Sequence, residues 1–501
     1  MEIFAKNALL SDGWANDVRI ETDGTRIATL RVGSKSAPGD TLVDTLLPAL
    51  SNLHSHSFQR AMAGMTEYRA SQRDSFWSWR ELMYRFVDRL TPEQIEAIAA
   101  LTFLEMQEAG YAAVAEFHYV HHQPDGRAYE DKAELSARIC AAAAQTGIGL
   151  TLLPVLYSYG GAGQTQLAGG QLRFGNTPEA YLALIDAART HLSDLPGDAR
   201  LGIAPHSLRA TCPDELAQVL AARPEGPVHI HVAEQVKEVE DVSAWLGQRP
   251  VEWLLDHTEV GPDWCLIHAT HMTDAETRAM AASGAVAGLC PITEANLGDG
   301  AFNGATYLEA GGAFGVGSDS NVRISLTEEL RTLEYSQRLR DMGRNVLASD
   351  ALSTGATLYQ GAATGGARAL AISLTEELRT LEYSQRLRDM GRNVLASDAL
   401  STGATLYQGA ATGGARALAR DSGRIETGAL ADLVAINSAS PALCALGNDR
   451  LLDGLVFAAA DTAVTDLWSA GRHQVRGGRH IARATIEKSY RQAMAALMAA
   501  L

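Results

Sequence analysis

The sequence predicts an α/β protein built on a (β/α)8 TIM-like barrel, and two observations support that prediction. Apolar strand-like stretches alternate with helical stretches through the first half of the chain, and histidines and an aspartate stand at the ends of several strand-like runs. Helices that connect parallel strands close such a barrel, whose active site is assembled at the carboxyl ends of the strands. We therefore expect one large catalytic barrel.

The alternation can be followed along the chain. A helix is expected from Thr91, with Pro92 in its first turn and Gly110 at its end, which are the positions those residue types prefer. Strand-like and helical stretches then follow one another over residues 111–120, 131–147, 148–158, 177–192 and 199–207. Repeated spacing of this kind indicates a parallel sheet.

The two ends of the chain do not show this alternation of strands and helices. Residues 1–46 read as short strands with a turn at Asp23-Gly24, and turn-bounded strands return over residues 424–437 and 464–481. A last helix, apolar on one side, is expected at residues 483–501, packed on the surface or in a dimer contact. We divide the chain into residues 1–46, 47–420, 421–482 and 483–501.

Composition restricts the class of protein. The chain has 501 residues, 46% of them hydrophobic and 20% charged, as in an ordinary globular protein with a large core. Its formal net charge of −17 disfavours nucleic acid or an anionic membrane as partner, because both require clustered Lys and Arg. The N-terminus shows no signal-peptide pattern and no apolar run reaches membrane-spanning length, so we expect a cytoplasmic protein.

The five cysteines support the same compartment. They are odd in number and lack CxxC spacing, which suits a reducing cytosol better than a disulfide framework. We expect all five to be buried small apolar residues: Cys140, Cys212, Cys265, Cys290 and Cys444.

The most informative stretch is residues 47–60, in which an apolar run ends at His54 and His56. Side chains of a strand repeat with period two, so both imidazoles project from one face and can share a cation. Three more residues stand at the ends of strand-like runs: His231, His268 and Asp319. One HxH pair alone is weak, but the four stretches together predict a metal site.

At these residues the chain resembles the amidohydrolase superfamily, in the branch that hydrolyses C–N bonds with one metal ion. More narrowly, it is similar to the formimidoylglutamate deiminases of histidine degradation. The similarity rests on residues 50–64, 74–85, 116–122, 204–210, 229–235, 266–271, 290–300 and 315–323. DSFWSWRELMYR is the most specific of these motifs. The resemblance implies a barrel joined to a small β-sandwich formed by both ends of the chain.

The resemblance also implies a mechanism. His54, His56, His231 and Asp319 would bind one Zn²⁺, a donor set that suits that ion and leaves room for water. No lysine stands at the end of the fourth strand to carry a bridge to a second metal. The metal lowers the pKa of its water to about 7, which makes hydroxide the nucleophile.

In this mechanism His268 is a base, Asp319 also holds the water, and Glu234 carries a proton to the departing nitrogen. The substrate is a small dicarboxylate, so guanidinium groups are expected in the pocket. Arg80 and Arg209 match the carboxylate-binding positions, and Gln59, Tyr119 and His206 match the other substrate contacts. We expect a homodimer.

One segment of the chain is not explained by the predicted fold. Residues 324–371 recur without a single change as residues 372–419. Selected structural repeats diverge, so identity of this extent indicates a recent duplication, engineering or an assembly error. Each copy opens with a capping pattern, Ser325 to Glu328 in the first. Our hypothesis is that the first copy's helix docks on the barrel and the excess residues are extruded; the alternative is a destabilised or inactive protein.

Two other functions remain open from the sequence. An aminohydrolase acting on a purine, pterin or triazine ring would keep the metal ligands but would not need Arg80 and Arg209. A non-catalytic barrel relative is the other alternative, since a fold does not guarantee function. The sequence predicts less about a few further residues. Trp77 and Trp79 are candidate pocket residues, and we expect Met62, Met65 and Met83 in the core. Chemistry alone gives no role to Glu294 and Asn296.

Overall fold

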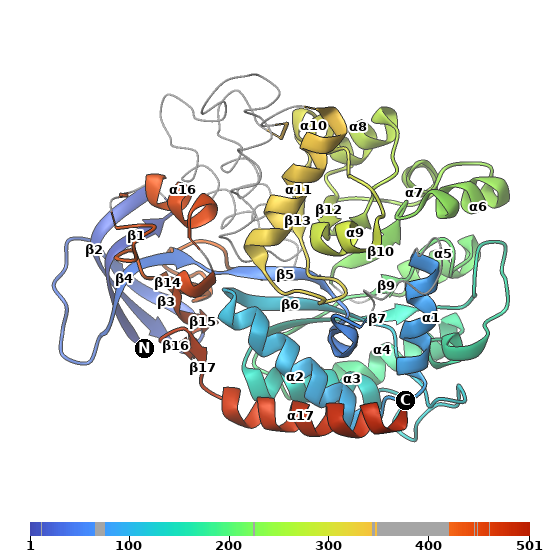
Figure 1. Cartoon of the computed structure of the whole chain (residues 1–501), viewed down its shortest axis with the longest axis horizontal. Helices are drawn as coiled ribbons and strands as arrows, with labels where there is room; N and C mark the ends of the chain where they lie inside the picture. Colours follow the sequence, from blue (N-terminus) through green and yellow to red (C-terminus); the bar gives the residue numbers. More distant parts are fainter. Residues whose placement is uncertain are drawn as a thin grey trace.

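The computed structural model describes residues 1–11, 13–65, 76–223, 226–342, 346–347, 420–444, 446–447, 449–459 and 461–501. Within them, a barrel of parallel strands surrounded by helices lies beside an eight-stranded sheet (Figure 1). The predicted fold class is confirmed by this architecture.

Eight successive strand positions form the barrel, the fourth of which is split into two short strands. They are β5 (Leu50–Ser55), β6 (Tyr111–His118), β7 (Gly149–Leu156), β8 (Arg200–Leu201) with β9 (Ala204–Pro205), β10 (Val228–Val232), β11 (Trp264–His268), β12 (Val286–Leu289) and β13 (Ala313–Val316). Neighbouring strands pair in parallel. Bridges from Ile203 to Val228 and from Ser55 to Asp319 close the circle.

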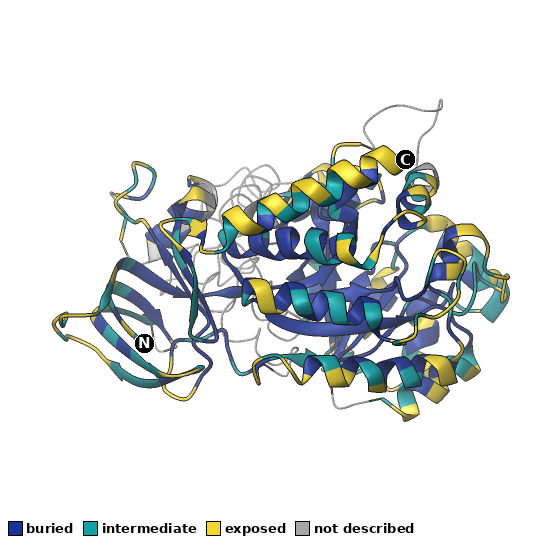
Figure 2. Cartoon of the chain, turned by 90° about the horizontal axis from the view of Figure 1, so that it is seen from below, coloured by how far each residue is buried: buried dark blue, intermediate teal, exposed yellow. Residues whose placement is uncertain are grey.

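Burial explains why these strands read as continuous apolar runs. Every residue of β5, β6, β7 and β10–β13 is buried, because side chains fill the barrel on one face and helices cover the other. In Figure 2 the helices show exposed residues on their outer sides and buried residues toward the strands.

The helices follow the strands in chain order. They are α1 (Phe76–Val87), α2 (Pro92–Glu108), α3 (Glu134–Thr146), α4 (Pro178–Leu192), α5 (Pro213–Ala221), α6 (Val236–Leu246), α7 (Pro250–His257), α8 (Asp274–Ser283), α9 (Pro291–Leu297), α10 (Gly304–Glu309) and α11 (Leu326–Asp341), with 3-10 turns at Ser57–Met62 (η1) and Gly169–Arg173 (η2). The helix predicted from Thr91 is α2, and Pro92 opens it as predicted. The side chain of Thr91 caps this helix, because it accepts a hydrogen bond from the N–H of Gln94.

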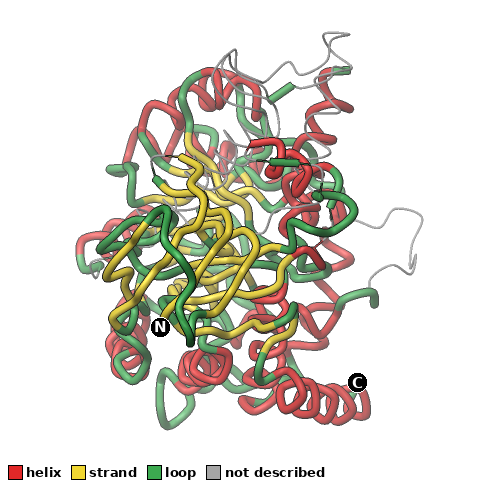
Figure 3. The backbone as a smooth tube through the Cα atoms, turned by 90° about the vertical axis from the view of Figure 1, so that its left-hand side faces the viewer, coloured by secondary structure: helices red, strands yellow, loops and turns green. Residues whose placement is uncertain are grey.

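Strands from both ends of the chain form the second body, as predicted. The sheet order is β17-β16-β15-β14-β4-β1-β2-β3. Figure 3 looks toward this side of the molecule, with the strands in yellow. The strands of the sheet are β1 (Glu2–Leu10), β2 (Gly13–Asp23), β3 (Arg26–Arg31), β4 (Thr41–Pro48), β14 (Leu433–Ile436), β15 (Val464–Ser469), β16 (Arg472–Arg476) and β17 (Arg479–His480), with α16 (Asp449–Phe457) and a 3-10 turn η3 (Asp461–Ala463) in the connection. The sheet has an apolar core of its own, which includes Ile3, Val18 and Trp468.

A buried group of charges joins the two bodies. Arg420 is 1% exposed and donates to both carboxylate oxygens of Asp432, at 2.7 and 2.8 Å. Its Nη1 donates to the Asp198 carboxylate at 2.6 Å, and Arg472 binds the same carboxylate with two hydrogen bonds of 2.8 Å. Asp198 follows α4 of the barrel and Asp432 precedes β14 of the sheet. Planar, doubly hydrogen-bonded pairs of this kind fix geometry as well as charge.

The first copy of the duplicated segment supplies α11. Ser325 accepts a hydrogen bond from the N–H of Glu328, and α11 packs on α9 and β13. Leu333 is 2% exposed within the main core. Glu334 accepts the backbone N–H groups of Val346 and Leu347, both at 3.2 Å. The expected extrusion of the excess residues concerns a part of the chain outside the described residues.

Three other expectations can be compared with the structure. The last helix is α17 (Arg483–Ala500), which packs on α2. Four cysteines are buried as expected, but Cys444 is exposed in the loop after β14. Met62 and Met83 are core residues, whereas Met65 is 38% exposed at the end of the turn after η1, so its assignment to the core was wrong. In the described part of the chain, no helix combines the length and hydrophobicity needed to cross a membrane.

Candidate active site

The predicted site residues come together at the carboxyl ends of the barrel strands. His54 belongs to β5 and His56 follows it, while His231 and His268 belong to β10 and β11. They line one pocket, apart from His54, which lies fully buried. The pocket is lined by His56, Gln59, Trp79, Arg80, Met83, Tyr84, Tyr119, Tyr157, Phe174, His206, Arg209, His231, Glu234, His268, Thr293, Leu297, Asp319 and Ser320.

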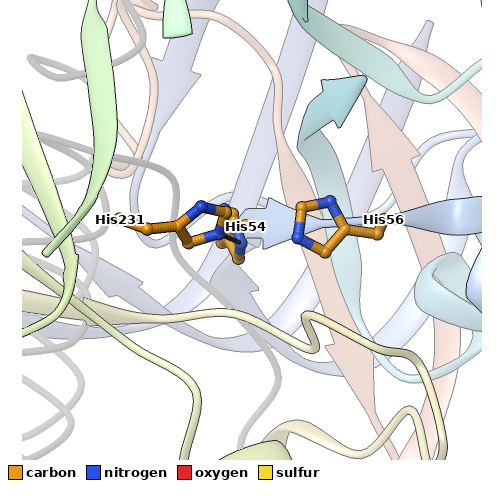
Figure 4. Close-up of side chains that lie close together, drawn as sticks. All are labelled: His54, His56 and His231. Carbon is orange, nitrogen blue, oxygen red and sulfur yellow. Dashed lines mark hydrogen bonds between the residues drawn. The ribbon is translucent and has the colours of Figure 1, made fainter. Parts of the chain in front are cut away.

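The imidazoles of His54, His56 and His231 lie close together (Figure 4). The Nδ1 atom of His56 lies 2.9 Å from the carbonyl of Phe117, and Nδ1 of His231 lies 3.1 Å from the carbonyl of His206. Because Nδ1–H donates to these carbonyls, the lone pairs of Nε2 are available for a metal ion. Burial and the neighbouring histidines lower the pKa of all three residues, to about 3 for His56.

The spacing of the donor atoms fits one tetrahedral ion. Two ligand atoms about 2.0–2.1 Å from one zinc ion lie roughly 3.3 Å apart at a tetrahedral angle. The Nε2 atoms of His54 and His231 are 3.1 Å apart, and Asp319 Oδ1 lies 3.3 Å from His56 Nε2 and 3.6 Å from His54 Nε2. Without a cation a proton must bridge the two facing nitrogens; a metal ion replaces that proton. The residues present therefore fit a metal with nitrogen and oxygen ligands.

Backbone contacts between the first and last strands position Asp319. The N–H of Asp319 donates to the carbonyl of His54, and the N–H of His56 donates to the carbonyl of Asp319, both at 2.9 Å. Gly317 permits this approach, because a Cβ atom there would lie 2.7 Å from the backbone nitrogen of His54. Burial raises the pKa of Asp319 to about 7, although His268 opposes the shift. A bound cation favours the ionised carboxylate.

His268 lies among carboxylates. Its Nε2 is 3.9 Å from Asp319 Oδ2 and 3.9 Å from Glu234 Oε1, and its Nδ1 is 3.2 Å from Glu294 Oε1. Burial lowers its pKa, but Glu234, the hydrogen bond with Glu294 and Asp319 together raise the pKa to about 10. The backbone of His268 has a φ of +66°, a strained conformation for a residue with a side chain.

Glu294 received no role from the sequence, and the structure places it against His268. It stands in the first turn of α9, 4% exposed, and the same oxygen that faces His268 accepts the N–H of Cys290 at 2.9 Å. A negative side chain five residues after the end of β12 was the available signal. Asn296 is exposed and does not line the pocket.

The two predicted arginines line the same pocket. Arg80 Nη2 donates to the hydroxyl of Tyr157 at 2.7 Å, and its guanidinium lies 5.3 Å from the ring centre of Tyr84. Arg209 Nη2 lies 3.1 Å from Glu234 Oε2. Both arginines are thus held with their charge at the pocket, a suitable arrangement for a carboxylate ligand.

The remaining predicted contacts are also present. Gln59 Nε2 donates to the hydroxyl of Tyr119 at 2.6 Å, and His206 lies beside Ser207 Oγ, 3.0 Å from Nδ1. Trp79 lines the pocket, while the side chain of Trp77 lies outside the described atoms. Sequence reasoning missed three aromatic residues of the pocket. Tyr84 stands on α1 within the motif of residues 74–85, whereas Tyr157 and Phe174 stand in loops with no motif to mark them. It also did not foresee that Met83 reaches the pocket.

The chain belongs to the amidohydrolase family, whose family model matches residues 45–473. Residues 1–44 match the family model described as the N-terminal domain of formimidoylglutamate deiminase HutF. Within the family, the chain is 46% identical over 500 residues to a formimidoylglutamate deiminase of Pseudomonas aeruginosa, and the match covers 99% of each protein. The predicted resemblance is confirmed.

Solved structures agree with the fold. A crystal structure of an amidohydrolase from Brucella melitensis has 46% identity and a TM-score of 0.85, over 99% of both chains. An adenosine deaminase from Xanthomonas campestris, solved with bound zinc, has 20% identity and a TM-score of 0.73 over 99% of this chain and 98% of its own; at that identity it shows the fold alone.

Proposed function

We propose that this protein hydrolyses N-formimino-L-glutamate to N-formyl-L-glutamate and ammonia, as a step of histidine degradation. The observation that supports this most directly is the pairing, in one pocket, of a three-histidine metal site with two guanidinium groups. A linear substrate with an amidine at one end and two carboxylates at the other matches this distribution of charge. The full-length identity to a formimidoylglutamate deiminase supports the same substrate.

We propose Zn²⁺ as the metal, one ion per chain, held by His54, His56, His231 and Asp319. When bound, the ion supplies Lewis acidity that allows water to act as a nucleophile at neutral pH. The donor spacings near 3.3 Å support this ligand set. The zinc-bound adenosine deaminase shares the fold and is consistent with the choice of metal.

The chain's own residues then move the protons. Asp319 and His268 lie side by side in the pocket. The positive charge of a bound ion would offset the carboxylates that raise the pKa of His268, so that its Nε2 could accept a proton from the water. Glu294 keeps the other proton of the ring on Nδ1, so that Nε2 faces the reaction. Glu234 takes up one proton of the water and delivers it to the amidine nitrogen, and the proton held by His268 follows as the C–N bond breaks. The oxygen of the new C–O bond becomes the formyl oxygen of the product, and ammonia leaves with both protons of the water.

Other residues that line the pocket recognise the substrate. Arg80 and Arg209 bind the carboxylates, while Gln59, Tyr119 and His206 contact the rest of the substrate. Tyr157 holds the Arg80 guanidinium in place, which lowers the conformational cost of binding. The buried aromatic side chains around the arginines strengthen these charge-assisted hydrogen bonds by excluding water.

The direct test is release of ammonia from N-formimino-L-glutamate by purified protein, with the metal content measured in the same sample. We expect activity with about one zinc ion per chain, loss of activity on chelation, and recovery when Zn²⁺ is restored. Bound metal without activity would instead direct attention to ring deamination, and Arg80→Ala and Arg209→Ala would then have little effect on the true substrate.

We also propose that the protein is a homodimer in the cytoplasm. The five cysteines are free thiols, consistent with a reducing compartment. Met498 of helix α17 is 47% exposed and Leu501, which follows the helix, is 39% exposed, which makes this end of the helix a candidate contact between subunits. Light scattering on the purified protein measures the subunit number, and a monomeric mass contradicts the dimer.

A further inference from the structure

Glu238 is a fully buried carboxylate next to the pocket, and the proposed mechanism gives it no part. It stands in the first turn of α6 with 0% exposure. Its Oε1 accepts the N–H of Ala233 at 3.2 Å, and its Oε2 accepts the N–H of Glu234 at 3.0 Å. One side chain therefore binds two successive backbone groups of the loop between β10 and α6.

The loop between β10 and α6 has a backbone conformation that needs stabilising contacts. Ala233 has a φ of +51°, in the left-handed region that side chains with a Cβ rarely adopt. The conformation turns the chain at the end of β10, so that Glu234 enters the pocket three residues after His231. Two hydrogen bonds donated by the backbone to the Glu238 carboxylate stabilise the turn, because charge-assisted bonds are stronger than neutral ones.

The same carboxylate also faces the recognition arginine. Arg209 Nε lies 3.6 Å from Glu238 Oε2, while Arg209 Nη2 lies 3.1 Å from Glu234 Oε2. The guanidinium is thus held between two carboxylates, one of which is the proposed proton carrier. Movement of Glu238 would displace Arg209 and Glu234 together.

We propose that Glu238 is a positioning residue that holds Arg209 and Glu234 as one unit, so that carboxylate recognition and proton transfer depend on the same buried side chain. The inference rests on the proposed function, because Arg209 and Glu234 take their roles from it. It predicts a particular pattern of loss: both KM and kcat change when Glu238 is altered, although Glu238 itself does not line the pocket.

The test compares Glu238→Gln with a matched control, Glu276→Gln. Glu276 is also buried, accepts a backbone N–H, that of Thr273, and pairs with an arginine, Arg249, at 2.7 Å, but none of these residues lines the pocket. Glu238→Gln keeps the shape but replaces one acceptor oxygen by a donor that opposes an N–H group. Glu238→Asp keeps the charge on a shorter side chain and serves as the second variant.

Two substrates separate the two effects: N-formimino-L-glutamate, and N-butylformamidine, which keeps the amidine and lacks both carboxylates. With the first, we expect Glu238→Gln to lower kcat and raise KM by about 10-fold each, a size typical of catalytic groups displaced by under 1 Å. With the second, only kcat should fall. Glu238→Asp should change kcat and KM less than Glu238→Gln does. Glu276→Gln should leave both constants unchanged per folded, metal-loaded chain.

The outcomes are distinct. Equal losses of kcat/KM on both substrates, or kinetics of Glu238→Gln like those of Glu276→Gln, overturn the inference while the function stands. If the unaltered protein releases no ammonia from N-formimino-L-glutamate, the proposed function fails instead.

Discussion

The duplicated segment permits a comparison that few proteins offer, because the same residue can be altered in either of two identical copies. Leu333 of α11 is 2% exposed in the main core, and its counterpart is Leu381. Leu333→Ala removes three buried carbon groups at about 0.8 kcal/mol each, and the cavity that remains adds to this, so the loss of stability should be about 3 kcal/mol. Leu381→Ala should cost almost nothing, because the structure builds α11 from the first copy.

Urea unfolding followed by circular dichroism measures the difference. With a slope near 3 kcal/mol per molar urea, the midpoint of Leu333→Ala should fall by about 1 M. The Leu381→Ala protein is the matched control, with the same substitution in the same local sequence. An equal fall for Leu381→Ala would mean that the second copy occupies the site. A fall seen only when both leucines are replaced would mean that the copies exchange.

Three further predictions concern recognition, catalysis and acid stability. Arg80→Met should raise KM for N-formimino-L-glutamate by about 10- to 100-fold, the value of one charge-assisted contact, and an unchanged KM in steady-state assays would argue against a carboxylate at this position. Glu294→Gln should lower kcat by about 10-fold or more without changing the metal content, since it no longer fixes the ring of His268; elemental analysis beside the kinetics detects a mere loss of metal. The arginines beside Asp198 hold the pKa of its carboxyl at about 2 against the opposing effect of burial, below the usual 3.8. Its contribution of about 2 kcal/mol is therefore complete above pH 4 and disappears as pH falls toward 2, and urea midpoints of Asp198→Asn should lack this part of the acid dependence.

The ligand positions could be predicted because their signal is local. His54 and His56 are two residues apart on a strand, and the period of the strand sends them to one side whatever surrounds them. His231, His268 and Asp319 could be added because parallel strands bring their carboxyl ends to one rim. Closure of the barrel then places Asp319 directly beside His54, through two backbone hydrogen bonds.

The supporting residues could not be predicted in the same way. The position of Glu238 depends on the left-handed turn at Ala233, which no local sequence preference indicates, since alanine rarely adopts it. Tyr157 meets Arg80 across 77 residues of chain, so the contact exists only after the barrel has closed. Met65 was assigned by its hydrophobic character alone, and single apolar residues on a surface are common.

The buried charges at Arg420 have a consequence for how this fold can change over generations. Leu347, which Glu334 holds, and Arg420, which is bonded to both bodies of the protein, are fixed points on either side of the boundary between the two copies. Between two anchored points, each doubling of the length of a flexible loop costs only about 0.6 kcal/mol of closure entropy. We therefore expect that a foreign domain inserted between Leu347 and Arg420 would leave the strand that leads to Asp319 in register.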